Sequence, residues 1–134
     1  PTLFDAIAVE AQRRISEFTP QEMANAIWAF ACVAWAQSQI FSVLGSAIAE
    51  HHVGDLDDSS KSQLYLAALY VQITWPDLEF PLSLHLESFR SAYTCNPPCP
   101  SQLQRDVSVV SKQMGWHHTF EYVTEEGFSL DLAQ

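Results

Sequence analysis

The stretch FTPQEMANAIWAFACVAWA, residues 18–36, decides the fold because it joins strong helix-start signals to a long apolar run. Thr19 occupies an N-cap position, Pro20 suits the first helical position, and Glu22 stands where it completes a capping box. Eleven apolar residues then follow without interruption, from Ala26 to Ala36. The stretch therefore predicts a helix with almost no polar side.

This predicted helix, residues 20–35, needs neighbours on more than one side. Phe18 and Met23 stand where a hydrophobic staple would close over its start. The apolar side chains fall into two adjacent stripes, the first formed by Met23, Ile27, Phe30, Ala31 and Ala34 and the second by Trp28, Cys32 and Trp35. We expect Cys32 to be a small core residue and the helix to be sandwiched between others.

Composition limits the classes of function. The chain has 134 residues, 48% of them hydrophobic, which is enough for the core of one ordinary domain. Sixteen acidic and six basic residues give a formal charge of −10. This charge argues against nonspecific binding of nucleic acid or anionic membranes, although a local basic groove stays possible. The longest apolar run is far shorter than the ~20 residues of a membrane span, so we expect none.

Helical spacing recurs along most of the chain, and period two appears near the end. Asp58 or Ser59 is expected to cap the fourth helix. Glu126-Gly127 suits a tight hairpin turn between two alternating runs, 119–124 and 128–133. Apolar residues at helical spacing predict further helices over residues 3–17 and 38–51, around Leu64–Val71, over 82–93, and over 103–114.

Two internal similarities suggest a helix-pair repeat. LFDAI at 3–7 matches IFSVL at 40–44, and residues 18–33 match residues 56–71 at an offset of 38. In a stacked array each inner helix contacts its partner and both neighbours, which explains its apolar surface. We therefore expect a mainly α fold of about six helices in solenoid-like pairs, followed by a β hairpin. The alternative is a non-repetitive six-helix bundle.

Three segments are expected. Residues 1–93 form the helical repeat region, and residues 94–100 form a linker rich in proline and cysteine. Residues 101–134 form a separate helix and hairpin. Four possible zinc ligands lie in or near the last two segments, in Cys95-x3-Cys99 and His117-His118. The two cysteines flank a pair of prolines, so a proline-stiffened loop is the simpler interpretation, and we expect no metal or cofactor.

Two motifs resemble those of a known group of proteins. P-Q-x-x-A-N-x-x-W-A-F-A, residues 20–31, resembles the first helix of octotricopeptide-type repeats of organellar proteins. G-x-S-x-D-x-A, residues 127–133, is similar to the hairpin that opens a RAP domain, the C-terminal module of FAST-kinase-like proteins. Residues 101–134 therefore look like the beginning of a RAP module whose later E-x-D-G segment is absent.

The resemblance implies RNA metabolism in mitochondria or plastids. Repeats of this type engage single-stranded RNA, for which the candidate residues here are Gln21 and Asn25. The second repeat has Ser59 and Gln63 in their place. The RAP module resembles a nuclease-like fold, in which Asp131 would be a remnant, and one carboxylate cannot supply an acid and a base or hold a catalytic metal.

Two functions are compatible with these observations. The acidity and the altered second repeat favour a non-catalytic structural subunit that binds other proteins in a large organellar complex, such as a ribosome or an energy-converting assembly. Trp28 and Trp35 are the candidate interface residues. The alternative is an organellar RNA-binding factor for transcript processing, stability or ribosome assembly. Neither function requires an enzyme activity or a small-molecule substrate.

Overall fold

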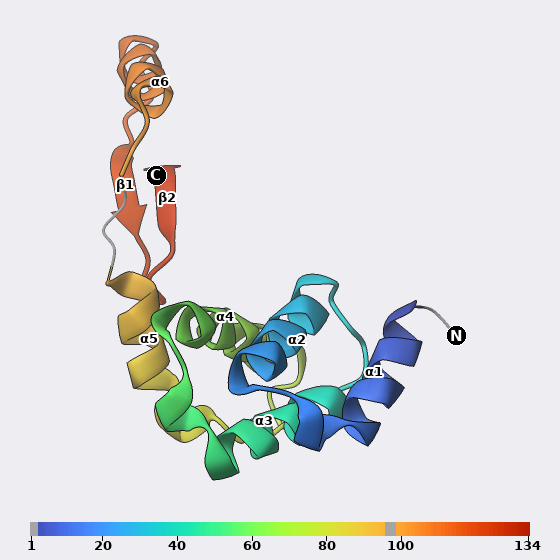
Figure 1. Cartoon of the computed structure of the whole chain (residues 1–134). Helices are drawn as coiled ribbons and strands as arrows, with labels where there is room; N and C mark the ends of the chain where they lie inside the picture. The colour runs from blue at the N-terminus through green and yellow to red at the C-terminus, as the bar shows by residue number, and fades with distance from the viewer. Residues whose placement is uncertain (1–2, 96–98) are drawn as a thin grey trace. The chain divides into compact units, whose positions relative to one another are not determined.

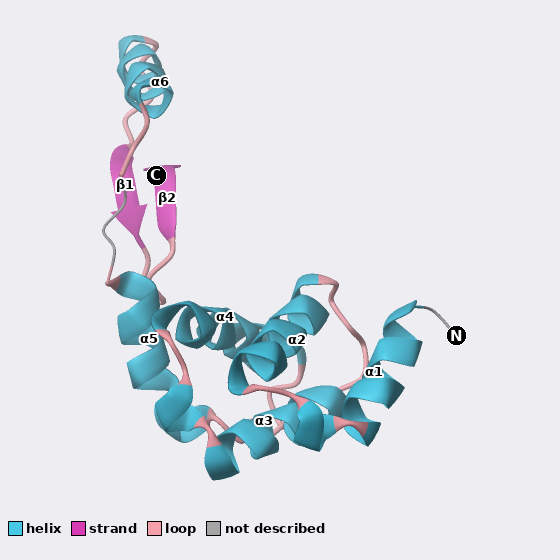
Figure 2. Ribbon diagram, in the orientation of Figure 1, coloured by secondary structure: helices cyan, strands magenta, loops and turns pink. Residues whose placement is uncertain are grey.

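The computed structural model describes residues 3–95 and 99–134. Six α-helices lie among these residues, followed by a two-stranded antiparallel hairpin (Figures 1 and 2). This arrangement confirms the mainly α fold with a C-terminal hairpin that the sequence predicted. The chain divides into two compact units, Pro1–Tyr93 and Thr94–Gln134, called unit 1 and unit 2 below.

Unit 1 is built from successive helices joined by short loops and single 3₁₀ turns. Within it α2 (Pro20–Cys32) packs against α4 (Asp58–Thr74) and α3 (Gln39–His51), and α1 (Leu3–Arg13) packs against α3 (Figure 1). The first residues of α2 and α4 are 38 residues apart, which is the repeat offset read from the sequence. The helices are α1 (Leu3–Arg13), α2 (Pro20–Cys32), α3 (Gln39–His51), α4 (Asp58–Thr74) and α5 (Leu86–Thr94).

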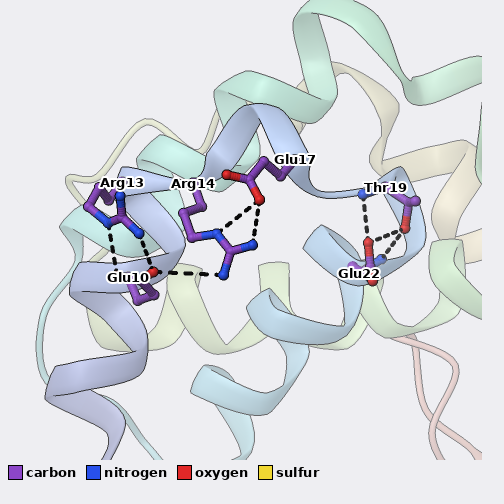
Figure 3. A network of polar contacts seen from close by, with 6 residues as sticks. All are labelled: Glu10, Arg13, Arg14, Glu17, Thr19 and Glu22. Carbon is purple, nitrogen blue, oxygen red and sulfur yellow. Dashed lines mark hydrogen bonds and ion pairs between the residues drawn. The ribbon is translucent and has the colours of Figure 1, made fainter.

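The capping box at the start of α2 is confirmed. Thr19 Oγ1 accepts a hydrogen bond from the backbone N–H of Glu22 at 3.3 Å, and Glu22 Oε2 accepts from the Thr19 N–H at 2.8 Å (Figure 3). The Thr19 hydroxyl also donates to Glu22 Oε2 at 2.8 Å. These bonds, the one from the backbone N–H first, lower the pKa of the Glu22 carboxyl. Two of the unpaired N–H groups of the helix end are thereby satisfied.

Thr19→Ala should lower the free energy of unfolding by about 1 kcal/mol, since it removes the acceptor for the Glu22 N–H. Thr19→Ser is the matched control and should retain most of the stability. The lowered pKa of Glu22 means that its carboxylate stabilises the fold above its ordinary pKa and less as the pH falls through the lowered value. Urea titrations of the variants at about pH 7 and about pH 3 measure both effects, and equal stability of all three proteins at pH 7 would contradict the prediction.

The end of α2 differs from the prediction, because the helix stops at Cys32 rather than near residue 35. Trp35 N–H bonds to the Phe30 carbonyl and Ala34 N–H to the Ala31 carbonyl, both at 3.0 Å, which is the hydrogen-bond pattern of a Schellman motif. Ala34 takes a φ of +51°, a conformation that usually needs glycine. The chain turns away here and leaves Cys32 exposed, so the expectation of a buried Cys32 was wrong.

Two other helix starts also differ slightly from the expected positions. Asp57, not Asp58 or Ser59, is the N-cap of α4, and its Oδ1 accepts from the Ser60 N–H at 2.7 Å. Hydrogen bonds from the side chain and then the backbone of Ser60 lower the pKa of Asp57. In the fifth helix, a 3₁₀ turn over Ser83–His85 precedes the α-helical part. At α4 the cap at Asp57 sets the boundary, whereas no side-chain cap precedes the 3₁₀ turn before α5.

The core of unit 1 lies between α2, α3 and α4. The largest side chains of this core are fully buried. Gly45 of α3 lets the loop after α4 approach closely, since a Cβ at position 45 would lie 3.3 Å from Phe80 Cε2. This contact explains why a glycine is placed inside a helix. The fully buried large side chains of the three helices are Met23, Ile27, Phe30, Ile40, Phe41, Leu44, Ile48, Leu64 and Val71.

Unit 2 contains α6 (Gln102–Gln113), β1 (Thr119–Val123) and β2 (Ser129–Ala133). The strands pair antiparallel with Tyr122 opposite Leu130. The connection is one residue longer than the tight turn predicted at Glu126-Gly127, because the Thr124 N–H bonds to the Phe128 carbonyl at 2.9 Å across residues 125–127. Gly127 takes a φ of +93° in this loop. Figure 2 shows the hairpin that follows α6.

Candidate functional site

The candidate site is a groove between the two inner helices of unit 1. It is an open hollow of about 180 Å³ lined by Trp28, Ala31 and Cys32 of α2 and by Leu66 and Tyr70 of α4. None of the five lining side chains carries a formal charge at neutral pH. We call this hollow the α2–α4 groove.

The two walls of the groove are equivalent in the repeat. The offset of 38 that aligns the repeats places Trp28 on Leu66 and Cys32 on Tyr70. Equivalent positions of α2 and α4 therefore line the two walls of the groove. Of these residues only Trp28 is predicted from the sequence as an interface residue. Leu66 and Tyr70 are not, although the alignment of residues 18–33 with 56–71 contains both.

A hydrogen bond and two ring contacts hold Tyr70 in place at one wall of the groove. The Tyr70 hydroxyl donates to the backbone carbonyl of Trp35 at 3.0 Å. The Tyr70 ring also packs against Phe41 and Trp75, with ring centroids 5.8 and 5.6 Å away. Trp28 on the opposite wall remains 38% exposed, so its indole is accessible to a binding partner.

Trp35 occupies a different place from Trp28. It follows the end of α2 and is half-buried between the rings of Phe4 and Phe30, at centroid distances of 6.0 and 5.6 Å. Its carbonyl receives the hydrogen bond from Tyr70. Trp35 thus supports the tyrosine wall of the groove through its backbone carbonyl. The two predicted interface residues do not form one surface stripe, because α2 ends at Cys32, between them.

The candidate RNA-binding residues Gln21 and Asn25 are both exposed on α2. Helical spacing places them in one row with Trp28 and Cys32, so the row leads into the groove. At the equivalent positions of α4, Ser59 is exposed, whereas Gln63 is half-buried and its Oε1 finds no hydrogen-bond partner among the described residues. The polar row is therefore not repeated in the same form on α4.

Three basic side chains of unit 1 are engaged by carboxylates. Arg13 Nη2 lies 2.6 Å from Glu10 Oε1, and Arg14 Nη2 lies 2.5 Å from Glu17 Oε2 (Figure 3). The hydrogen bond from Arg13 lowers the pKa of Glu10, and the one from Arg14 lowers the pKa of Glu17. Lys61 Nζ, near the start of α4, lies 3.7 Å from Asp58 Oδ1. These cations are partly neutralised by their own neighbours.

Asp131, the candidate nuclease remnant, makes a structural contact in unit 2. Gln104 Nε2 donates to Asp131 Oδ1 at 2.8 Å, while the Ser101 N–H donates to Gln104 Oε1 in a capping box. The carboxylate therefore ties β2 to the first turn of α6. Throughout the described residues, no group of three or more His, Cys, Asp or Glu side chains is arranged to hold a metal ion.

The four possible zinc ligands do not form a metal-binding group among the described residues. Cys95 and Cys99 are both exposed, and the residues between them lie outside the described residues. His118 is engaged elsewhere, with its Nε2 2.8 Å from Ser108 Oγ and its Nδ1 3.0 Å from the Trp116 carbonyl oxygen.

Comparison of the chain with protein-family models, with curated proteins and with solved structures finds no match. None of the described helices combines the length and the apolar character needed to cross a membrane. The chemistry of the groove is therefore the main basis for a functional interpretation.

Proposed function

We propose that the chain is a non-catalytic scaffold subunit that holds other proteins together in a large organellar assembly. The α2–α4 groove would receive an apolar side chain from a partner protein. The observation that carries this proposal is the uncharged groove with Trp28 exposed on one wall. The organellar setting, in a mitochondrion or a plastid, rests only on the resemblance of residues 20–31 and 127–133 to octotricopeptide-type and RAP sequences.

The chemistry of the groove supports a protein partner. Filling an apolar cavity with an apolar side chain releases water and adds dispersion contacts with the walls. Tryptophan and tyrosine are also the residue types that most often dominate the binding energy of protein interfaces. Tyr70 is held in place by its hydrogen bond and ring contacts before any partner arrives, so little conformational entropy is lost there on binding.

Charge supports the same choice over RNA. The chain carries a formal charge of −10, and phosphate contacts require cations that can release counterions. Arg13, Arg14 and Lys61 already face carboxylates within their own helices or turns. These three side chains would have to leave their carboxylate partners to bind a phosphate, which would reduce the net free energy of RNA binding.

One observation favours the alternative, an RNA-binding factor. Gln21 and Asn25 present amide groups in the same row as the exposed Trp28 ring. Amides can read the edges of unstacked bases, and an aromatic ring can stack on one. This row is what an RNA-binding repeat would use.

A titration with single-stranded RNA tests the choice between the two functions. We expect only weak binding to mixed-sequence RNA at about 50 mM salt and a small change at about 200 mM salt. Filter binding measures both. The scaffold proposal would be contradicted by tight RNA binding that weakens steeply as the salt concentration rises. In that case Asn25→Ala would abolish the binding and Gln72→Ala would not. Gln72 is an exposed α4 residue outside the row and serves as the matched control.

A further inference from the structure

The apolar side of α6 faces outward. Leu103, Val107, Val110 and Met114 follow one another at helical spacing and form a single row, which we call the α6 stripe. They are 72%, 44%, 52% and 82% exposed, respectively. A soluble helix normally buries such a row against its own domain.

The polar side of α6 is the one that binds the hairpin segment. Gln104 donates to Asp131 of β2, and Ser108 Oγ lies 2.8 Å from His118 Nε2, just before β1. Ser108 is also the only buried side chain among the described residues of unit 2. Polar contacts therefore join α6 to the hairpin segment, and the α6 stripe is left largely exposed.

A cavity lies beside this row. It has a volume of about 210 Å³ and is lined by Leu103, Gln104 and Val107 of α6 and by Asp131 and Leu132 of β2. Its apolar walls suit one aliphatic side chain of a partner. The Asp131 carboxylate lines the same cavity. Asp131 retains an oxygen beyond the one that accepts from Gln104, so it has capacity for a cationic donor.

The charges around the α6 stripe have one sign. Helical spacing places Asp106 along one flank of the stripe, and Asp131 lines the cavity on the other flank. The same spacing places Arg105 and Lys112 on the side of α6 away from the stripe, and Arg105 Nη2 bonds to the Pro100 carbonyl there. A partner with basic residues beside its apolar row would complement this arrangement.

We propose that the α6 stripe and the adjacent cavity dock an amphipathic helix of a protein partner with lysine or arginine on both flanks of its apolar face. The partner would lay its apolar row along the stripe, insert one side chain into the cavity, and direct cations to Asp106 and Asp131. A second copy of this chain is disfavoured because it would bring together two carboxylate-flanked rows. The residues involved differ from those of the α2–α4 groove, so the two proposals can fail separately.

The test uses the full chain and synthetic helical peptides as probes. One peptide has leucines at i, i+4, i+7 and i+11 with lysine flanks, its twin has glutamate flanks, and a third has the lysine peptide's composition in scrambled order. Fluorescence anisotropy measures binding. The lysine-flanked peptide should bind at least about tenfold more tightly than either of the others, and its affinity should fall with salt.

Variants of the chain locate the binding surface. Val107→Glu should weaken binding of the lysine-flanked peptide by about tenfold or more, whereas Val109→Glu, on another face of α6 and 55% exposed, should change it by less than about twofold. Asp131→Asn keeps an acceptor for Gln104 and removes the negative charge. It should therefore weaken binding of the lysine-flanked peptide and make the affinity less dependent on salt. Far-ultraviolet circular dichroism and thermal unfolding verify that each variant keeps the fold.

Several results would overturn the proposal. The first is that the lysine-flanked peptide does not bind at about 1 mM, and the second is that its glutamate-flanked twin binds equally well. The third is that Val107→Glu and Val109→Glu reduce the affinity for the lysine-flanked peptide equally. Self-association of the chain that Val107→Glu abolishes, seen by sedimentation velocity, would assign the stripe to a second copy instead.

Discussion

Replacing Phe30 with alanine should destabilise unit 1 by about 3–5 kcal/mol. Phe30 is 1% exposed, and its ring lies 5.6 Å from the rings of both Phe4 and Trp35. The substitution removes a large buried side chain and leaves a cavity between α1, α2 and the turn after α2. It also removes the apolar contact that accompanies the Schellman motif at the end of α2.

Urea unfolding monitored by circular dichroism measures the loss for Phe30→Ala. Ile73→Ala, at a position 82% exposed on α4, is the matched control and should change the stability by less than about 0.5 kcal/mol. Phe30→Leu keeps an apolar side chain and should cost less than the alanine variant. The prediction is wrong if Phe30→Ala costs no more than Ile73→Ala.

Local signals near the start of α2 were sufficient to predict its first turn. Thr19, Pro20 and Glu22 act within four residues of one another, so no tertiary contact is needed to read them. The end of the same helix was not predictable in this way. Ala34 adopts the left-handed conformation without being glycine, and the Trp35 ring that packs there depends on Phe4, which is distant in sequence.

The sequence contains enough information to predict both walls of the α2–α4 groove. Trp28 was identified as an interface candidate, and the repeat offset already related it to Leu66 and related Cys32 to Tyr70. The hydrogen bond from Tyr70 to the Trp35 carbonyl had no sequence signal, because it depends on the turn after α2.

The apolar row of α6 shows another limit of sequence patterns. The spacing of Leu103, Val107, Val110 and Met114 was visible in the sequence, and it predicts an amphipathic helix. Periodicity identifies the faces of a helix but not which face its own domain covers. Here the bonds of Gln104 and Ser108 decide that the polar side faces the hairpin segment.

The second large effect concerns Trp28 and the proposed scaffold role. Trp28→Gln removes the exposed wall of the α2–α4 groove while keeping a good helix former at a neutral position. Loss of a tryptophan at the centre of an interface typically costs roughly 2 kcal/mol or more, which is about thirtyfold in affinity. Ile73→Gln changes another exposed apolar residue of unit 1 in the same way and is the matched control.

Sedimentation of tagged full-length chain in its native assembly tests the scaffold role most directly. The wild-type protein and Ile73→Gln should migrate with a large protein assembly, before and after ribonuclease treatment, whereas Trp28→Gln should shift to light fractions. Thermal unfolding of purified Trp28→Gln verifies that it is folded. Co-sedimentation of Trp28→Gln with the assembly at the wild-type level, or release of the wild-type chain by ribonuclease alone, would contradict the proposal that this groove holds a protein.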